Sequence, residues 1–111
     1  FLSGSPRTVI NNGTIVSNFN TGVTDIAGAT FTNGSTGVVT ATNGATVSFG
    51  INPTNQGLLQ ANNSGGTGGT LNLTSDTVTN TGGTILAGDG GTVTLSNSTI
   101  NGGSLTVNPT G

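Results

Sequence analysis

The chain has 111 residues, of which 30% are hydrophobic and 4% charged, and its net charge at pH 7 is −2. With one arginine and no lysine it cannot neutralise a row of phosphates, which excludes nucleic acid as a partner. Cysteine is absent, which excludes disulfides and thiolate metal sites, and no apolar run is long enough for insertion into a membrane.

A five-residue motif, G-x-[ILV]-x-[ASV], recurs along the chain and predicts one strand in each repeat. Its copies begin at Gly13, Gly37, Gly57, Gly83 and Gly103. The apolar residues at the centre of the motif are Ile15, Val39, Leu59, Ile85 and Leu105, which are 24, 20, 26 and 20 residues apart. Such a period is typical of a repeat array.

Two further motifs follow the first in constant order and predict a second and a third strand. The second, [GA]-T-ϕ-x-ϕ with ϕ apolar, begins at Ala45, Gly69 and Gly91, and residues 22–26 match it less regularly. The third, T-ϕ-x-N, begins at Thr8, Thr30 and Thr77, and again at Thr99 with its Asn one place early. The middle repeat offers only Ile51 and Asn52 before Pro53 at this place.

Three strands in constant order predict an all-β fold, a three-sided parallel β-helix (β-solenoid), expected to be right-handed. It would have about five coils of 20–26 residues, with residues 1–111 forming one domain. The alternation of apolar and polar residues predicts which residues stack as inward ladders. These ladders are Ile15, Val39, Leu59, Ile85 and Leu105; Ser17, Ala41, Ala61 and Ala87; Val47, Leu71 and Val93; Phe49, Leu73 and Leu95; and Val9, Phe31, Val78 and Ile100.

The corners between strands are expected to absorb the variation in repeat length. Asn11, Asn33 and Asn80 are predicted to form a ladder of side-chain amides at one corner. Residues 62–68 and 51–56 are predicted to bulge outward. Residues 1–7 are interpreted as a partial coil or an interface. No capping helix is predicted at either end, which favours a fragment of a longer fibre or a subunit that stacks on another copy.

The segment NTGGTILAGDGGTVTLSNSTINGGSLT, residues 80–106, has echoes at VINNGTIVS and TGVVTATNGATVSFG. This spelling resembles the repeats of filamentous-haemagglutinin-like and autotransporter-passenger β-helices of bacterial surfaces. The resemblance covers nearly the whole chain. It implies a right-handed parallel β-helix, an extracellular location and a role in adhesion or fibre building, with no catalytic motif to transfer.

The residues give little support to catalysis or metal binding. Asp25, Asp76 and Asp89 fall at different heights and corners of the predicted coils, and each is interpreted as a turn residue. His, Cys, Glu, Lys and Tyr are all absent, so acid-base and nucleophilic schemes lack parts. The Gly-Asp-Gly-Gly turn at Asp89 has no counterpart that would complete a calcium site. We therefore expect no enzyme activity, no catalytic residue, no cofactor and no metal.

Outward threonines on the third strand provide an alternative function. The residues concerned are Thr8, Thr30, Thr32, Thr77, Thr79 and Thr99. Regular threonine arrays resemble those of ice-binding solenoids, and Thr40 with Thr42 is expected to form a further outward pair. However, threonine also suits any exposed strand position. In the middle repeat the expected outward pair is Gly50 and Asn52, and this gap favours the simpler interpretation.

The sequence thus predicts a non-catalytic, extracellular structural or adhesive solenoid of a cell-surface adhesin or self-assembling fibre. Its expected partners are copies of itself or flanking coils, stacked end to end, and host or surface glycans. Ice binding is the first alternative, and a carbohydrate-binding or carbohydrate-degrading β-helix is the second.

Overall fold

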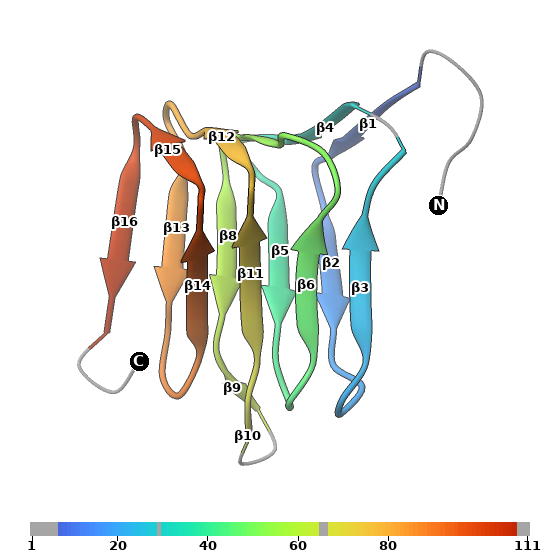
Figure 1. Ribbon diagram of the computed structural model, residues 1–111, viewed down its shortest axis with the longest axis vertical. Helices are drawn as coiled ribbons and strands as arrows, with labels where there is room; N and C mark the ends of the chain where they lie inside the picture. The colour runs from blue at the N-terminus through green and yellow to red at the C-terminus, as the bar shows by residue number, and fades with distance from the viewer. Residues whose placement is uncertain (1–6, 29, 65–66, 109–111) are drawn as a thin grey trace.

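The structure, a computed structural model, describes residues 7–28, 30–64 and 67–108. These residues form β-strands, turns and bends without any helix, so none of them belongs to a helix that could cross a membrane. Figure 1 shows the strands stacked side by side, with the first coil at one end of the stack and the last at the other. The sequence interpretation of residues 1–7 falls, except for Arg7, outside the described residues.

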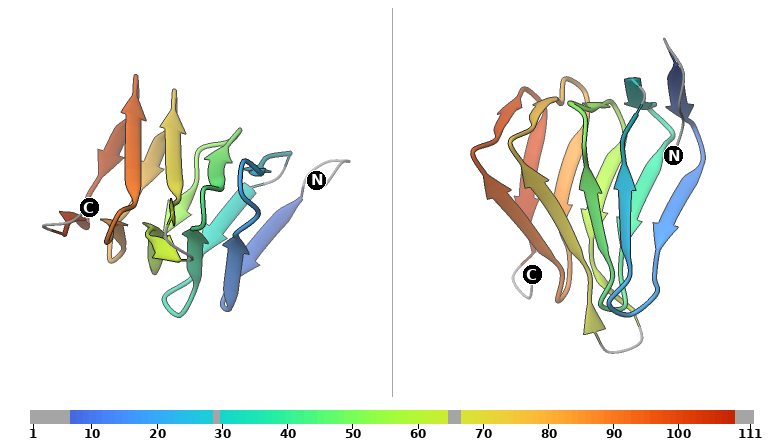
Figure 2. Two further views of the ribbon diagram at one scale, coloured as in Figure 1. Left: turned by 90° about the horizontal axis from the view of Figure 1, so that it is seen from below. Right: turned by 45° about the vertical axis from the view of Figure 1, so that its right-hand side comes forward.

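Three parallel sheets form the sides of the stack (Figures 1 and 2). Sheet A contains, in spatial order, β1 (Thr8–Asn11), β4 (Thr30–Asn33), β7 (Thr54–Asn55), β12 (Thr77–Thr79) and β15 (Thr99–Asn101). Sheet B contains β2 (Thr14–Ser17), β5 (Val38–Ala41), β8 (Leu58–Ala61), β13 (Thr84–Ala87) and β16 (Ser104–Val107). Sheet C contains β3 (Val23–Ile26), β6 (Thr46–Phe49), β11 (Thr70–Thr74) and β14 (Thr92–Ser96).

Each coil gives one strand to sheet A, one to sheet B and one to sheet C. The described strands therefore make four complete turns and the first two strands of a fifth. This confirms the predicted all-β, three-sided parallel β-helix. Coil length varies at the corners, while the strands of each sheet stay in register.

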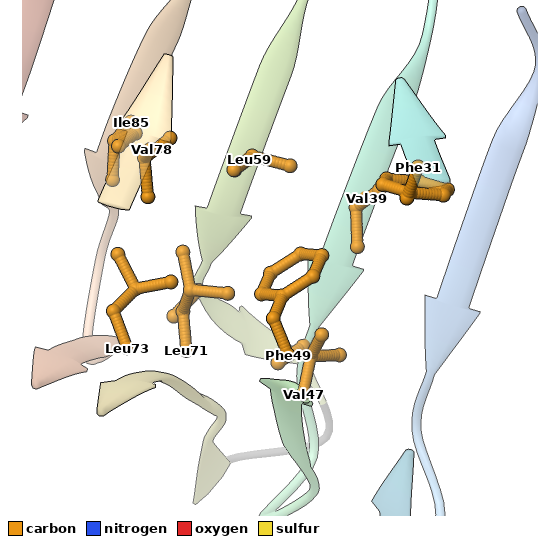
Figure 3. Close-up of a cluster of buried hydrophobic side chains, with 11 residues drawn as sticks. Phe31, Val39, Val47, Phe49, Leu59, Leu71, Leu73, Val78 and Ile85 are labelled. Atoms are coloured by element: carbon orange, nitrogen blue, oxygen red, sulfur yellow. The ribbon is translucent and has the colours of Figure 1, made fainter. Parts of the chain in front are cut away.

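The predicted inward ladders form the core. In sheet B, Val39 pairs with Ile15 and Leu59, and Ile85 pairs with Leu59 and Leu105. The other two sheets contribute the pairs Val47–Leu71, Leu71–Val93, Leu73–Leu95, Val9–Phe31 and Val78–Ile100. Figure 3 shows the largest of these side chains converging from the three sheets on a shared interior. Phe31 of sheet A and Phe49 of sheet C meet there with ring centroids 5.9 Å apart.

An asparagine ladder follows sheet A at its corner with sheet B. The side-chain amide of Asn11 donates to the Oδ1 of Asn33 at 2.9 Å, Asn33 donates to Asn55 at 2.9 Å, and Asn55 donates to Asn80 at 2.8 Å. Asn33, Asn55 and Asn80 are fully buried. Each amide also donates to backbone carbonyls, as Asn33 does to Gly37 and Leu58 at 3.1 Å. The predicted ladder is confirmed, and Asn55 adds a member that the sequence motif did not include.

The prediction that residues 51–56 bulge outward is wrong. Pro53 and Asn55 are buried, and Ile51 packs against the core. Proline has no N–H to donate, but the Pro53 carbonyl accepts the N–H of Thr79 at 3.1 Å, so the chain still pairs at this point. Just before it, the side-chain Oδ1 of Asn52 accepts the N–H of Thr77 at 2.9 Å in place of a backbone carbonyl. A short β7 therefore continues sheet A.

The prediction that residues 62–68 project outward is confirmed for the described part, residues 62–64 and 67–68. Two short strands, β9 (Asn63–Ser64) and β10 (Thr67–Gly68), pair in antiparallel fashion at the corner between β8 and β11. In Figure 1 they extend beyond the neighbouring corners of the stack. This hairpin explains why the interval from Leu59 to Ile85 is the longest in the chain.

Candidate functional site

Sheet A turns two columns of side chains to solvent, and threonine fills most positions in both. The first column contains Thr8 and Thr30, then Thr77 and Thr99, and Asn52 lies between these two pairs with its side chain accepting the N–H of Thr77. The second column contains Ile10, Thr32, Thr54, Thr79 and Asn101. We call the seven threonines of these columns the threonine face. The structure thus brings together all six threonines that the sequence singled out and adds Thr54.

Thr54 changes the middle row of this surface. The sequence interpretation placed Gly50 and Asn52 there, whereas the structure places Asn52 and Thr54. Thr54 pairs with Thr32 on one side and with Thr79 on the other, so three threonines follow one another without interruption. The signal was present in the sequence, because Asn55 lies two residues before Gly57 as Asn11 lies two residues before Gly13, and Thr54 directly precedes Asn55 as Thr32 directly precedes Asn33.

The threonine face is accessible to solvent. Thr32 and Thr54 are half-buried and the other five threonines are exposed. In the described part of the chain, the threonine hydroxyls that hydrogen bond to other protein groups lie elsewhere, at Thr24, Thr36, Thr40 and Thr74. The face therefore presents hydroxyl and methyl groups that are available to an external surface.

The backbone of the threonine face is fixed from inside. Between the two columns, Phe31 and Val78 point inward and are 1% and 0% exposed. One residue after the second column comes the asparagine ladder, which binds each coil to the next. A threonine side chain is itself stiff because its Cβ is branched. Rows and columns are thus held at the spacing of the sheet.

The other two outward surfaces are less uniform. Sheet B carries Val16, Val38, Leu58 and Leu86 among its outward residues. The expected outward pair Thr40 and Thr42 is wrong, because these residues are only 8% and 7% exposed. Gln60 covers Thr40 and donates to its hydroxyl at 3.0 Å, and Thr42 lies beyond the end of β5.

Sheet C has several outward threonines but also a charge. Thr46, Thr70 and Thr92 form one column, and Asp25 shares the second with Ser48, which donates to its carboxylate at 3.2 Å. Among the three sheets, sheet A has the most threonine-rich outward surface, and no charged side chain lies in its two columns.

The inward ladders stay apolar up to the last described strands of sheets B and C, where several of their side chains become exposed. Leu95, Leu105 and Val107 are 45%, 50% and 64% exposed. One coil earlier, Leu73 and Ile85 occupy the same columns and are 0% exposed. The last described strands therefore offer both unpaired backbone groups and apolar side chains.

The three aspartates lie apart. Asp25 is on sheet C, Asp89 is in the turn between β13 and β14, and Asp76 is at the corner between β11 and β12. Asp76 is only 4% exposed, and its Oδ2 has no hydrogen-bond partner. Burial raises the pKa of Asp76, against a backbone hydrogen bond at Thr74 that lowers it, and the charge of Asp25 adds to the rise. No group of three metal-ligating side chains gathers within residues 7–28, 30–64 and 67–108.

Comparisons of the chain with protein-family models, with curated proteins and with solved structures gave no match.

Proposed function

We propose that this chain is a structural and adhesive β-solenoid segment of an extracellular fibre or cell-surface adhesin, and that it lengthens by the stacking of further coils. One observation carries the proposal: Leu95, Leu105 and Val107, inward residues on the last described strands of sheets C and B, are exposed, although Leu73 and Ile85, which precede Leu95 and Leu105 in the same columns, are fully buried. Exposed apolar side chains of this kind would be buried if another coil packed against them.

The mechanical part of the proposal follows from the pairing. Each coil is linked to the next by parallel hydrogen bonds in all three sheets, by the apolar columns and by the buried amides of the asparagine ladder. Repeat architectures of this type gain stability from each nearest-neighbour interface. A rod built in this way resists bending and presents long uncharged faces to its surroundings.

The partner in this proposal is a further coil, from a second copy of the chain or from flanking sequence. All coils pair in parallel, so the edge of β16 has the polarity that the edge of β2 accepts. Stacked in this register, Leu105 would meet Ile15 of the next copy and Ile100 would meet Val9, the same kinds of apolar contact that join the internal coils. Sheet C has one described strand fewer than sheets A and B, so a further strand would be needed there between β14 and the β3 of the next copy.

Self-association tests the stacking. We expect the purified chain to show concentration-dependent association in analytical ultracentrifugation and fibres in electron micrographs. Leu105→Asp should abolish both, because it puts a charge into an apolar column. Thr106→Asp is the matched control, since Thr106 lies on the same strand but faces outward, and it should leave association intact. A parent chain that stays monomeric at high concentration would sink the proposal for copies of this chain.

Adhesion is tested separately by binding of the chain to glycan arrays and to cells. The exposed hydroxyls and amides of the outward faces favour neutral polar ligands, because hydroxyls and amides both donate and accept hydrogen bonds. Retention of neutral glycans that is lost on unfolding the chain would support the adhesive part. Binding to neither glycans nor cells would reduce the proposal to a purely structural segment.

A further inference from the structure

We propose that the threonine face of sheet A is a binding site for ice. The site comprises Thr8, Thr30, Thr32, Thr54, Thr77, Thr79 and Thr99. This inference is independent of the stacking proposed above, because the face lies on the side of the rod and the stacking edges lie at its ends.

The first argument is geometric. In-register pairing of parallel strands sets neighbouring rows about 4.8 Å apart, and outward residues of one strand are about 6.8 Å apart. Seven of the nine outward positions on the five strands are threonines. Their hydroxyls and methyls repeat in two dimensions, and the first column is interrupted at Asn52, which precedes β7. A ligand that matches such an array must itself repeat in two dimensions. An ice surface does so, whereas a single polysaccharide chain repeats in one.

The second argument concerns hydrogen bonding. The hydroxyls of the face are not engaged with protein groups in the described part of the chain, in contrast to those of Thr40 and Thr74. Each can both donate and accept, as a water molecule does. Because the side chains and the backbone beneath them are held in place, ordering water on this face costs little further entropy.

The third argument concerns charge. The two columns contain threonine, asparagine and one isoleucine. Asp76 lies next to the face but is buried, and Asp25 is on another sheet. A charged mineral surface or an anionic glycan would be recognised by charged side chains, which this face does not supply. The chemistry therefore favours a neutral lattice of hydrogen-bond donors and acceptors.

Thermal hysteresis and ice-affinity partitioning of the purified chain test the inference. We expect the parent to depress the freezing point below the melting point, to shape ice crystals and to be retained in growing ice. Thr54→Tyr, at the centre of the face, should lose most of the hysteresis, because the ring holds the surface away from ice. Thr94→Tyr is the control: Thr94 is an exposed, outward threonine of sheet C, and its substitution should retain the activity.

Circular dichroism of each variant establishes that the fold is kept. If Thr54→Tyr fails to fold, Thr79→Tyr replaces an exposed threonine in the same column and should give the same loss. A folded parent with no hysteresis, no ice shaping and no retention in ice would overturn the inference. Equal loss of activity in Thr79→Tyr and Thr94→Tyr would also overturn it, since the binding surface would then not be sheet A.

Discussion

Replacement of Asn55 by alanine should lower the free energy of unfolding by about 3–5 kcal/mol. The Asn55 side chain is 0% exposed. It accepts from Asn33 at 2.9 Å and donates to the Oδ1 of Asn80 at 2.8 Å and to the carbonyl of Thr84 at 3.1 Å. Alanine removes all of these bonds and fills none of the space. A buried polar group left without its partner costs about 1–3 kcal/mol, and two or three groups are affected.

The loss is large on the scale of the whole chain, because a domain of this length has a free energy of unfolding of roughly 5–15 kcal/mol. Urea denaturation followed by far-ultraviolet circular dichroism measures it. Asn101→Ala is the control, since Asn101 is exposed, lies in sheet A and pairs with Thr79 outside the ladder. We expect Asn101→Ala to stay within about 0.5 kcal/mol of the parent. If Asn55→Ala costs no more than this control, the ladder is not a major source of stability and the reasoning fails.

Three further substitutions test other contacts. Gly57→Ala should destabilise the fold strongly, because a Cβ there would overlap the carbonyl oxygen of Gly37. Gly13→Ala is the control and should be tolerated, since a Cβ at this equivalent corner of the first coil would have no atom nearer than 4.0 Å. Comparable urea midpoints for the two variants would contradict this expectation. Leu71→Ala removes a fully buried side chain from the core and should cost about 2–5 kcal/mol, and a loss below about 1 kcal/mol would mean that the interior collapses around the cavity. The raised pKa of Asp76 means that the folded state binds the carboxyl proton more tightly than the unfolded state, so the contribution of this proton to stability is full at acid pH and is lost as pH rises through the folded pKa. Asp76→Asn should therefore raise the free energy of unfolding at neutral pH and lose this advantage in acid. Equal effects of the substitution at neutral and acid pH would refute this assignment.

The sequence was sufficient to predict the columns of the core. Ile85, Val93 and Ile100 each sit in a motif whose alternation allows one inward register, because a slip by one residue would turn every apolar side chain to solvent. The structure pairs these residues as the motifs predict. Even the irregular first coil keeps its place: Thr24 occupies the column of Val47, and its hydroxyl bonds to that of Ser17 at 3.0 Å.

The course of residues 51–56 could not be predicted from motif spelling. Proline usually interrupts a strand because it has no N–H to donate, but at Pro53 the pairing with β12 uses only its carbonyl, which accepts the N–H of Thr79. The side chain of Asn52 then takes the place of a backbone acceptor for Thr77. Both substitutions depend on contacts between coils, which local propensity does not contain. The error concealed Asn55 in the ladder and Thr54 on the threonine face.

The asparagine ladder also determines how regular the threonine face can be. Thr32, Thr54 and Thr79 each directly precede a ladder asparagine, so the amide bonds between coils fix the rows in which these threonines stand. The core columns alone would keep the apolar side of each strand turned inward, but apolar contacts tolerate small displacements of one coil relative to the next. Buried amides do not tolerate them, because their hydrogen bonds are short and directional. Asn55→Ala should therefore weaken ice binding more than Leu71→Ala at equal loss of stability, although both leave all seven threonines in place. Equal hysteresis in two such variants, each measured well below its unfolding midpoint, would mean that the core columns are enough to order the face.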